Sequence, residues 1–118
     1  MATIRITDLK LRTIIGINNW ERKTKQDVAI NITLEFNAAR AAQNDDIEDT
    51  VDYKTLTKKV IKAVEASRFN LLESLTQAIL NIALEDKKIL RATVRVDKPQ
   101  ALRFADSVSV EMSKKQSS

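Results

Sequence analysis

The chain offers few side-chain types for chemistry. It contains no histidine and no cysteine, which excludes Ser-His triads, thiolate nucleophiles and the commonest transition-metal ligands. Catalysis would therefore use carboxylates, lysine, tyrosine or bound water. Side chains of these types stand at the expected ends of secondary-structure elements at Glu21, Tyr53, Glu73 and Lys98.

Each of these four residues also has an ordinary structural interpretation. Glu21 can be a solvated loop charge, and Tyr53 can be an amphipathic residue at the edge of the core. Glu73 can complete a helix capping box, and Lys98 can end a strand before a proline. The spacing of the four residues leaves both kinds of interpretation open.

Basic residues near two of the candidates indicate a possible anionic ligand. Arg22, Lys23 and Lys25 follow Glu21, and Arg103 follows Lys98. They are either solubilising charges or contacts for phosphate. The formal net charge is only +4 and aromatic residues make up 4% of the chain, which argues against a nucleic-acid partner because base stacking needs exposed aromatics.

Strands are predicted in both halves of the chain. The segments with extended or alternating character are residues 4–17, 27–36, 90–96 and 104–112. The first changes phase at Thr7 and Asp8, which predicts a bulge. Gly16 then permits a turn or a close backbone approach, and the polar residues 18–26 form a loop.

Two helices are predicted between the two pairs of strands. Apolar residues recur at helical spacing over residues 56–64, and Thr50 or Asp52 can cap this helix. A second helix follows Asn70, where Asn70 and Glu73 have the spacing of a capping box. The predicted order of elements is ββααββ.

This order is typical of an α+β domain, with both helices on one face of an antiparallel four-stranded sheet. For 118 residues we expect one domain over residues 1–113 and a disordered tail over residues 114–118. The two open edges of such a sheet favour oligomerisation. No segment is typical of a membrane helix or a secretory signal, so we expect a cytoplasmic protein with no membrane partner.

Five groups of residues, in order along nearly the whole chain, resemble the dihydroneopterin aldolase family. They are residues 11–17 (LRTIIGI), Glu21 with Gln26, 49–53 (DTVDY), 70–75 (NLLESL) and 94–99 (VRVDKP). Residues 101–109 (ALRFADSVS) are more similar to the dihydroneopterin triphosphate 2′-epimerase branch of this family than to its aldolases. Ile15 favours the same branch, because aldolases commonly have a histidine at that position.

The resemblance implies a fold, an assembly and an acid/base pair. The fold is the tunnelling fold, or T-fold, in which four subunits form a ring whose sheets join into one barrel. Two rings stack into a homo-octamer, with each active site at a subunit interface. The catalytic residues would be Glu21, Lys98 and Tyr53, with Tyr53 supplied by the neighbouring subunit.

The resemblance also implies which residues bind a pterin. A carboxylate at Glu73 can accept two parallel hydrogen bonds from the 2-amino group and N3 of the ring. The other residues assigned to the substrate are Leu72, Val51 and Asp52, the last two through their backbone. Arg103 is our first candidate for the phosphates, because it lies in the segment that differs from the aldolases.

The function implied is epimerisation at C2′ of 7,8-dihydroneopterin triphosphate to 7,8-dihydromonapterin triphosphate, with weak aldolase side activity. The N5=C6 imine of the dihydropterin can accept the electrons of the breaking C1′–C2′ bond, so we expect no metal and no organic cofactor. Two alternatives are a dihydroneopterin aldolase of folate biosynthesis and a non-catalytic RNA- or ligand-binding module.

Overall fold

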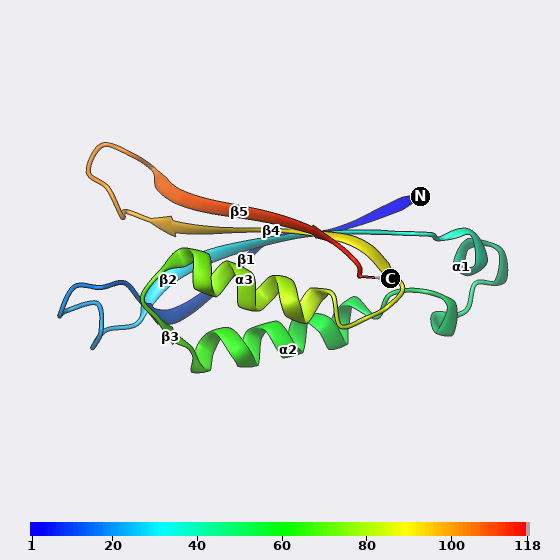
Figure 1. The fold of residues 1–118 in the computed structure, drawn as a ribbon, viewed down its shortest axis with the longest axis horizontal. Helices are drawn as coiled ribbons and strands as arrows, with labels where there is room; N and C mark the ends of the chain where they lie inside the picture. Colours follow the sequence, from blue (N-terminus) through cyan, green and yellow to red (C-terminus); the bar gives the residue numbers. More distant parts are fainter. Residues whose placement is uncertain (118) are drawn as a thin grey trace.

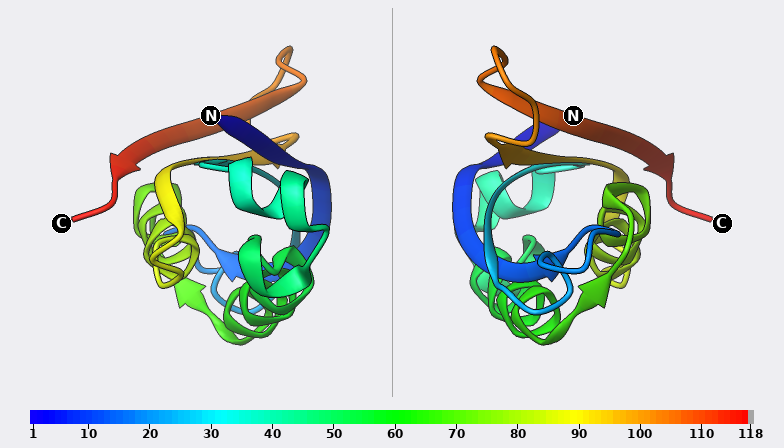
Figure 2. Two further views of the ribbon diagram at one scale, coloured as in Figure 1. Left: turned by 90° about the vertical axis from the view of Figure 1, so that its right-hand side faces the viewer. Right: turned by 90° about the vertical axis from the view of Figure 1, so that its left-hand side faces the viewer.

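A curled five-stranded sheet wraps around two long helices (Figures 1 and 2). The structure is a computed structural model that describes residues 1–117. The strands are β1 (Ala2–Ile15), β2 (Gln26–Phe36), β3 (Arg68–Phe69), β4 (Ile89–Pro99) and β5 (Ser107–Lys115). The helices are α1 (Ala39–Asn44), the 3-10 helix η1 (Ile47–Asp49), α2 (Tyr53–Ala66) and α3 (Leu72–Ala83).

The predicted α+β fold, with α2 and α3 on one face of the sheet, is confirmed. The strand order is β3-β1-β2-β4-β5, and the four long strands pair in antiparallel fashion. The prediction of four strands missed β3, which pairs in parallel with Ile14 and Ile15 of β1. A strand of two residues has no alternation from which it could be predicted.

The hydrophobic core lies between the sheet and the two long helices. Every second residue of β2 from Val28 to Phe36 is buried, as the alternation predicts. The helices contribute the apolar stripes of amphipathic helices, formed by Leu56, Val60, Val64, Leu75, Ile79, Leu80 and Ala83. This packing fixes where the helix ends lie, and those ends carry several of the candidate residues.

The predicted bulge in the first strand is confirmed. The register between β1 and β2 shifts between Ile6 and Leu9, and Asp8 has a left-handed φ of 52°. The Asp8 N–H donates to Asn31 Oδ1 at 3.0 Å. The extra residue keeps the apolar side chains on both sides of the bulge directed toward the helices.

One predicted helix cap is present and the other is not. The Asp52 carboxylate accepts from the Thr55 N–H at the start of α2, as predicted. The capping box at Asn70 and Glu73 is wrong, because α3 has Leu71 as its N-cap and no side chain caps it. Glu73 therefore occupies the second helical position, one short of the position from which a capping-box carboxylate reaches back.

The last strand and the C-terminal segment differ from the predicted boundaries. β5 begins at Ser107, because Phe104 lies in the preceding loop with a φ of 71° that is foreign to strands. The prediction of a disordered tail is wrong for residues 114–116. Residues 114 and 115 end β5, and Gln116 Nε2 donates to the carbonyls of Leu84, Asp86 and Ile89. Ser118 lies outside the described residues.

No helix within residues 1–117 is long and apolar enough to cross a membrane.

Candidate active site

An ion pair joins Glu21, in the loop between β1 and β2, to Lys98 near the end of β4. Lys98 Nζ donates to Glu21 Oε2, and the two side chains are only 13% and 6% exposed. Because β2 pairs with both β1 and β4, the strand ends meet at one end of the sheet. The structure thus brings together two predicted residues that are 77 positions apart.

Two amide side chains complete the surroundings of the Glu21 carboxylate. Asn18 donates to Oε1 through its backbone N–H at 3.1 Å and its Nδ2 at 2.8 Å. Gln26 Nε2 donates to Oε2 at 3.3 Å and to the Ile15 carbonyl at 2.7 Å. Asn18 is not among the residues predicted from the sequence, although asparagine often bonds to nearby groups in turns.

Gly16 allows the Glu21 carboxylate to lie directly against the main chain. Its φ of 124° is in the left-handed region, and a Cβ at this position would overlap the carboxyl carbon and both oxygens of Glu21. The close backbone approach predicted for this glycine is therefore made by a side chain of the same loop.

The Glu21 carboxylate is held in its ionised form. The hydrogen bond from Lys98 and those from Asn18 and Gln26 lower the pKa of Glu21 from 4.5 to about 2, against the opposing effect of burial. Near neutral pH Glu21 is therefore a fixed carboxylate that faces Lys98 Nζ. This arrangement orients Lys98 for proton transfer more readily than it lets Glu21 carry a proton itself.

Arg22 connects the Glu21 loop to β3. Its Nη1 donates to the carbonyls of Gly16 and Phe69 at 3.2 and 3.0 Å, and its Nη2 donates to the carbonyl of Arg68 at 2.6 Å. In return, Arg68 Nη2 donates to the Arg22 carbonyl at 3.0 Å. The Arg22 guanidinium is thus held in place against β3 by three contacts to backbone carbonyls.

Glu73 and Leu72 lie at the same end of the molecule, in the first turn of α3 (Figure 1). β3 precedes this helix, and Phe69 of β3 accepts a hydrogen bond from the Gly16 N–H at 3.3 Å. The Glu73 side chain is exposed, and within residues 1–117 it makes no hydrogen bond or ion pair. Its carboxylate is therefore available to a ligand.

Val51, Asp52 and Tyr53 lie where α2 begins, at the end of that helix away from the Glu21 loop (Figure 1). α2 has 14 residues, so it separates them from the Glu21 end by about 20 Å. Val51 is buried, whereas Tyr53 is 51% exposed. One protomer therefore does not bring Tyr53 to its own Glu21 and Lys98.

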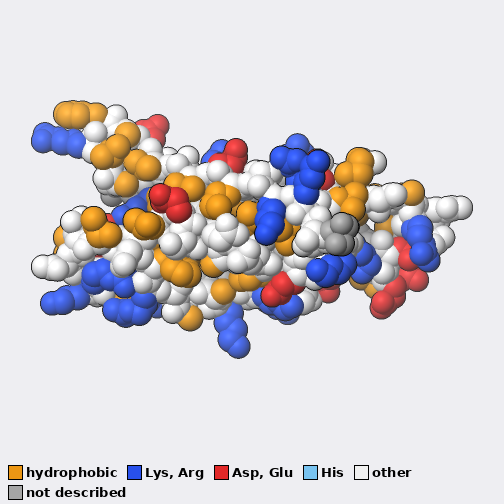
Figure 3. Space-filling model, in the orientation of Figure 1, with side chains coloured by type: hydrophobic (Ala, Val, Ile, Leu, Met, Phe, Trp, Pro, Cys, Tyr) orange, Lys and Arg blue, Asp and Glu red, His pale blue; other side chains and the backbone are white. Residues whose placement is uncertain are grey.

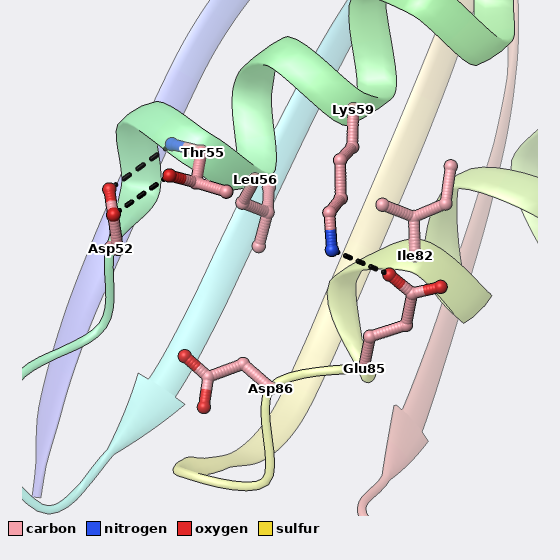
Figure 4. Close-up of a pocket in the computed structure, with 7 residues that line it drawn as sticks. All are labelled: Asp52, Thr55, Leu56, Lys59, Ile82, Glu85 and Asp86. Atoms are coloured by element: carbon pink, nitrogen blue, oxygen red, sulfur yellow. Dashed lines mark hydrogen bonds and ion pairs between the residues drawn. The ribbon is translucent and has the colours of Figure 1, made fainter.

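The start of α2 borders a cavity of about 210 Å³ (Figure 4). The Asp52 side chain is used there as a helix cap and bonds to Thr55 Oγ1 at 2.8 Å, and these bonds from Thr55 lower the pKa of Asp52. Across the cavity Lys59 pairs with Glu85 at 3.4 Å. Because the Asp52 carboxylate is already hydrogen-bonded to Thr55, the Asp52 backbone remains for the pterin contact that the resemblance implies.

Arg103 lies in the loop between β4 and β5, which projects from the body of the molecule (Figure 1). Its guanidinium lies 5.1 Å from the ring centroid of Phe104, a cation–π distance. The Phe104 side chain is itself 98% exposed. The structure places Arg103 on the strand connection that follows Lys98 but in no described contact with the pair.

Within residues 1–117, no group of three carboxylates has the arrangement of a metal site. The polar groups gathered at the Glu21 end are a carboxylate, an ammonium group and amides. These groups can orient a polar ligand and exchange protons with it.

Comparison with known proteins places the chain in a family. The sequence model for dihydroneopterin aldolase matches residues 4–113. The chain belongs to the dihydroneopterin aldolase family. It is 51% identical over 112 residues to the dihydroneopterin triphosphate 2′-epimerase of Pseudomonas aeruginosa, covering 95% of this chain and 91% of that protein. It is 48% identical over 112 residues to the Escherichia coli epimerase, covering 95% and 93%.

Among solved structures, the chain is similar to Escherichia coli dihydroneopterin aldolase in complex with neopterin. The TM-score is 0.91 at 26% identity, covering 97% of this chain and 99% of that one. The resemblance inferred from the sequence motifs is confirmed, and the fold is the T-fold of this family. Identity to the named epimerases is thus nearly twice that to this aldolase.

Proposed function

We propose that this protein epimerises C2′ of 7,8-dihydroneopterin triphosphate to the monapterin form, with weak aldolase activity as a side reaction. The observation that carries the proposal is the identity of 51% and 48% to two dihydroneopterin triphosphate 2′-epimerases over 95% of the chain. The Glu21–Lys98 pair supplies groups that suit the chemistry.

The reaction needs one proton removed and one delivered. A base takes the proton of the 2′-hydroxyl group, and the C1′–C2′ bond breaks to leave an aldehyde at C2′. The bonding electrons form a C1′=C6 double bond, and an acid protonates N5. When the aldehyde turns over before the reverse addition, C2′ is inverted; when it escapes, the net reaction is aldol cleavage.

We assign proton transfer to Lys98, working with ordered water, and the orientation of its ammonium group to Glu21. This division follows from the low pKa of Glu21, whose oxygens are already occupied by four donor groups. Tyr53, with an exposed side chain, would act in the site of a neighbouring subunit.

We assign the pterin ring to Glu73, whose exposed carboxylate can accept two parallel N–H bonds. Leu72, at the start of the same helix, and the backbone of Val51 and Asp52 from a neighbour would line the ring. Arg103 would contact the phosphates from the loop after β4.

This assignment requires an oligomer, because the two groups of residues lie at opposite ends of α2 in one protomer (Figure 1). The sheet has open edges along β5 and along most of β1, since β3 pairs with β1 only at Ile14 and Ile15. Unpaired edges favour pairing with another chain. We propose a homo-octamer of two stacked four-subunit rings, and sedimentation of an active monomer would contradict it.

The test is to incubate the purified protein with 7,8-dihydroneopterin triphosphate and to separate the products by chromatography with mass detection. We expect a product of unchanged mass with the retention of the monapterin epimer. Stoichiometric release of a glycolaldehyde derivative would instead identify an aldolase. Absence of any turnover would favour a binding module.

A further inference from the structure

A groove opens beside the Glu21–Lys98 pair and continues onto the helix-free face of the sheet. Its first part is a cavity of about 320 Å³ that includes Arg12, Thr24, Lys25, Gln26, Asp27 and Gln100 in its lining. A second cavity of about 340 Å³ shares Arg12 and Asp27 and adds Lys10. Together they form what we call the basic groove, and each is of a size that holds small ligands.

The basic groove is connected to the acid/base pair through two residues. Gln26 lines the groove and donates through Nε2 to Glu21 at 3.3 Å. Pro99 lines both cavities and directly follows Lys98 in β4. A substrate tail that continues past Lys98 would therefore meet this groove.

The groove offers more positive than negative charge. The Arg12 guanidinium is held in place by a bond from Nη2 to the Lys25 carbonyl at 3.1 Å and by an ion pair with Asp27 at 3.4 Å. A guanidinium has five N–H donors, so donors of Arg12 remain for a ligand. The Lys25 ammonium group has no carboxylate partner within residues 1–117.

Two other arginines at this end of the molecule are held by backbone carbonyls. Figure 3 shows Lys and Arg side chains gathered around the loop between β1 and β2. Arg22 and Arg68, however, donate to each other's main chain and to neighbouring carbonyls. Arg12 and Lys25 are the two cations among the residues that line the first cavity, and Lys10 lines the second.

We propose that the basic groove is the subsite for the phosphate groups of the substrate, with Arg12 and Lys25 as its charged contacts. This inference rests on the proposed function. The Thr24 hydroxyl and the amide of Gln100 add neutral donors in the same cavity. Asp27 opposes the binding of an anion, so it limits the affinity of the subsite.

The experiment measures the ratio of kcat/KM for 7,8-dihydroneopterin triphosphate to kcat/KM for the phosphate-free substrate. We expect Lys25→Ala and Arg12→Gln each to lower this ratio about tenfold, as loss of one solvated charge-assisted contact should. Asp27→Asn should raise the ratio, because it removes the opposing charge. All three effects should weaken as salt increases. The matched control is Lys62→Ala, which removes an exposed lysine on α2 that does not line the groove.

Inorganic triphosphate provides a second measurement, as an inhibitor that competes with the triphosphate substrate. We expect it to inhibit the wild type and to lose about a hundredfold in potency in the Arg12→Gln, Lys25→Ala double variant. Lys25→Ala also keeps the test interpretable if Arg12→Gln fails to fold, because the Lys25 side chain makes no described contact.

The outcomes separate the two proposals. Suppose the wild type epimerises the triphosphate, but the double variant keeps both the preference for the triphosphate substrate and the inhibition by inorganic triphosphate. The proposed subsite is then wrong, and the proposed function is unaffected. If the preference for the triphosphate is lost in Arg103→Ala but kept in the Arg12→Gln, Lys25→Ala double variant, the phosphates bind at the β4–β5 loop and the groove proposal is overturned. If the wild type releases glycolaldehyde with no preference for the triphosphate, the proposed function itself has failed.

Discussion

Replacing Glu21 by glutamine tests the electrostatic role of the central ion pair. The carboxylate accepts hydrogen bonds from Asn18, Gln26 and Lys98. Glutamine keeps the shape but turns one acceptor oxygen into a donor group. In the variant, Lys98 loses its counter-charge and its ammonium group faces an amide, so both stability and its dependence on pH should change.

The size of the effect follows from the pKa of Glu21, which falls from 4.5 to about 2 in the folded protein. One unit corresponds to about 1.4 kcal/mol, so the full shift would stabilise the fold by about 3 kcal/mol. The side chain is only 6% exposed, but it lies in a loop at the end of the molecule with little protein beyond it. We therefore expect a contribution on the order of 2 kcal/mol.

The sign of the pH dependence is defined by the same shift. A carboxyl group with a lowered pKa in the folded state stabilises the fold fully above the unfolded pKa of 4.5. This stabilisation is lost as the pH falls from 4.5 toward 2. The free energy of unfolding of the wild type should therefore fall toward that of Glu21→Gln across this acid range.

The assay is urea unfolding of both proteins between neutral pH and the acid range, at one protomer concentration because assembly contributes to stability. Glu65→Gln is the matched control, since Glu65 is an exposed carboxylate on α2 without an ion pair in residues 1–117. The difference between wild type and Glu21→Gln should narrow as pH falls, whereas that for the control should stay near zero. Parallel stability curves for wild type and Glu21→Gln would refute the reasoning.

Substitutions at four further positions test the geometry. Gly16→Ala should destabilise the fold by about 1–3 kcal/mol through backbone strain and also reduce turnover by displacing Glu21; unchanged thermal unfolding and kcat would contradict the close packing. Asp52→Ala should lower the midpoint of urea unfolding through loss of a helix cap, while Asp52→Asn should retain most of the capping. Glu73→Ala should weaken neopterin binding by about 2–4 kcal/mol in calorimetry, whereas Lys98→Ala should mainly lower kcat; equal effects on binding would argue against this division.

Secondary structure was largely predictable because its signals are local. The alternation over residues 27–36 and the helical spacing over residues 56–64 each reflect one buried face, and both elements are present. The phase change at Thr7 and Asp8 was visible for the same reason. The capping box predicted at Asn70 is absent because α3 has Leu71, not Asn70, as its N-cap. The direction in which the chain passes from β3 into α3 sets this position, and residue spacing carries no information about that direction.

The sequence by itself also determined which chemistry is available. A chain without histidine or cysteine leaves carboxylate, lysine and tyrosine, and the order of its motifs is enough to indicate the family. Neither observation depends on how the residues pack, because one concerns composition and the other the linear order of motifs.

Tertiary structure alone decided how the site is assembled. The contact between Glu21 and Lys98 spans 77 positions and exists because β2 pairs with both neighbouring strands. Arg22 is indistinguishable in the sequence from the basic residues around it, yet its donors are taken by carbonyls of β3 and Gly16. Tyr53 lies at the far end of α2, away from its own Lys98. Hydrogen bonds to backbone groups and contacts between distant strands depend on where the chain returns in space, and that is set by packing of the whole core.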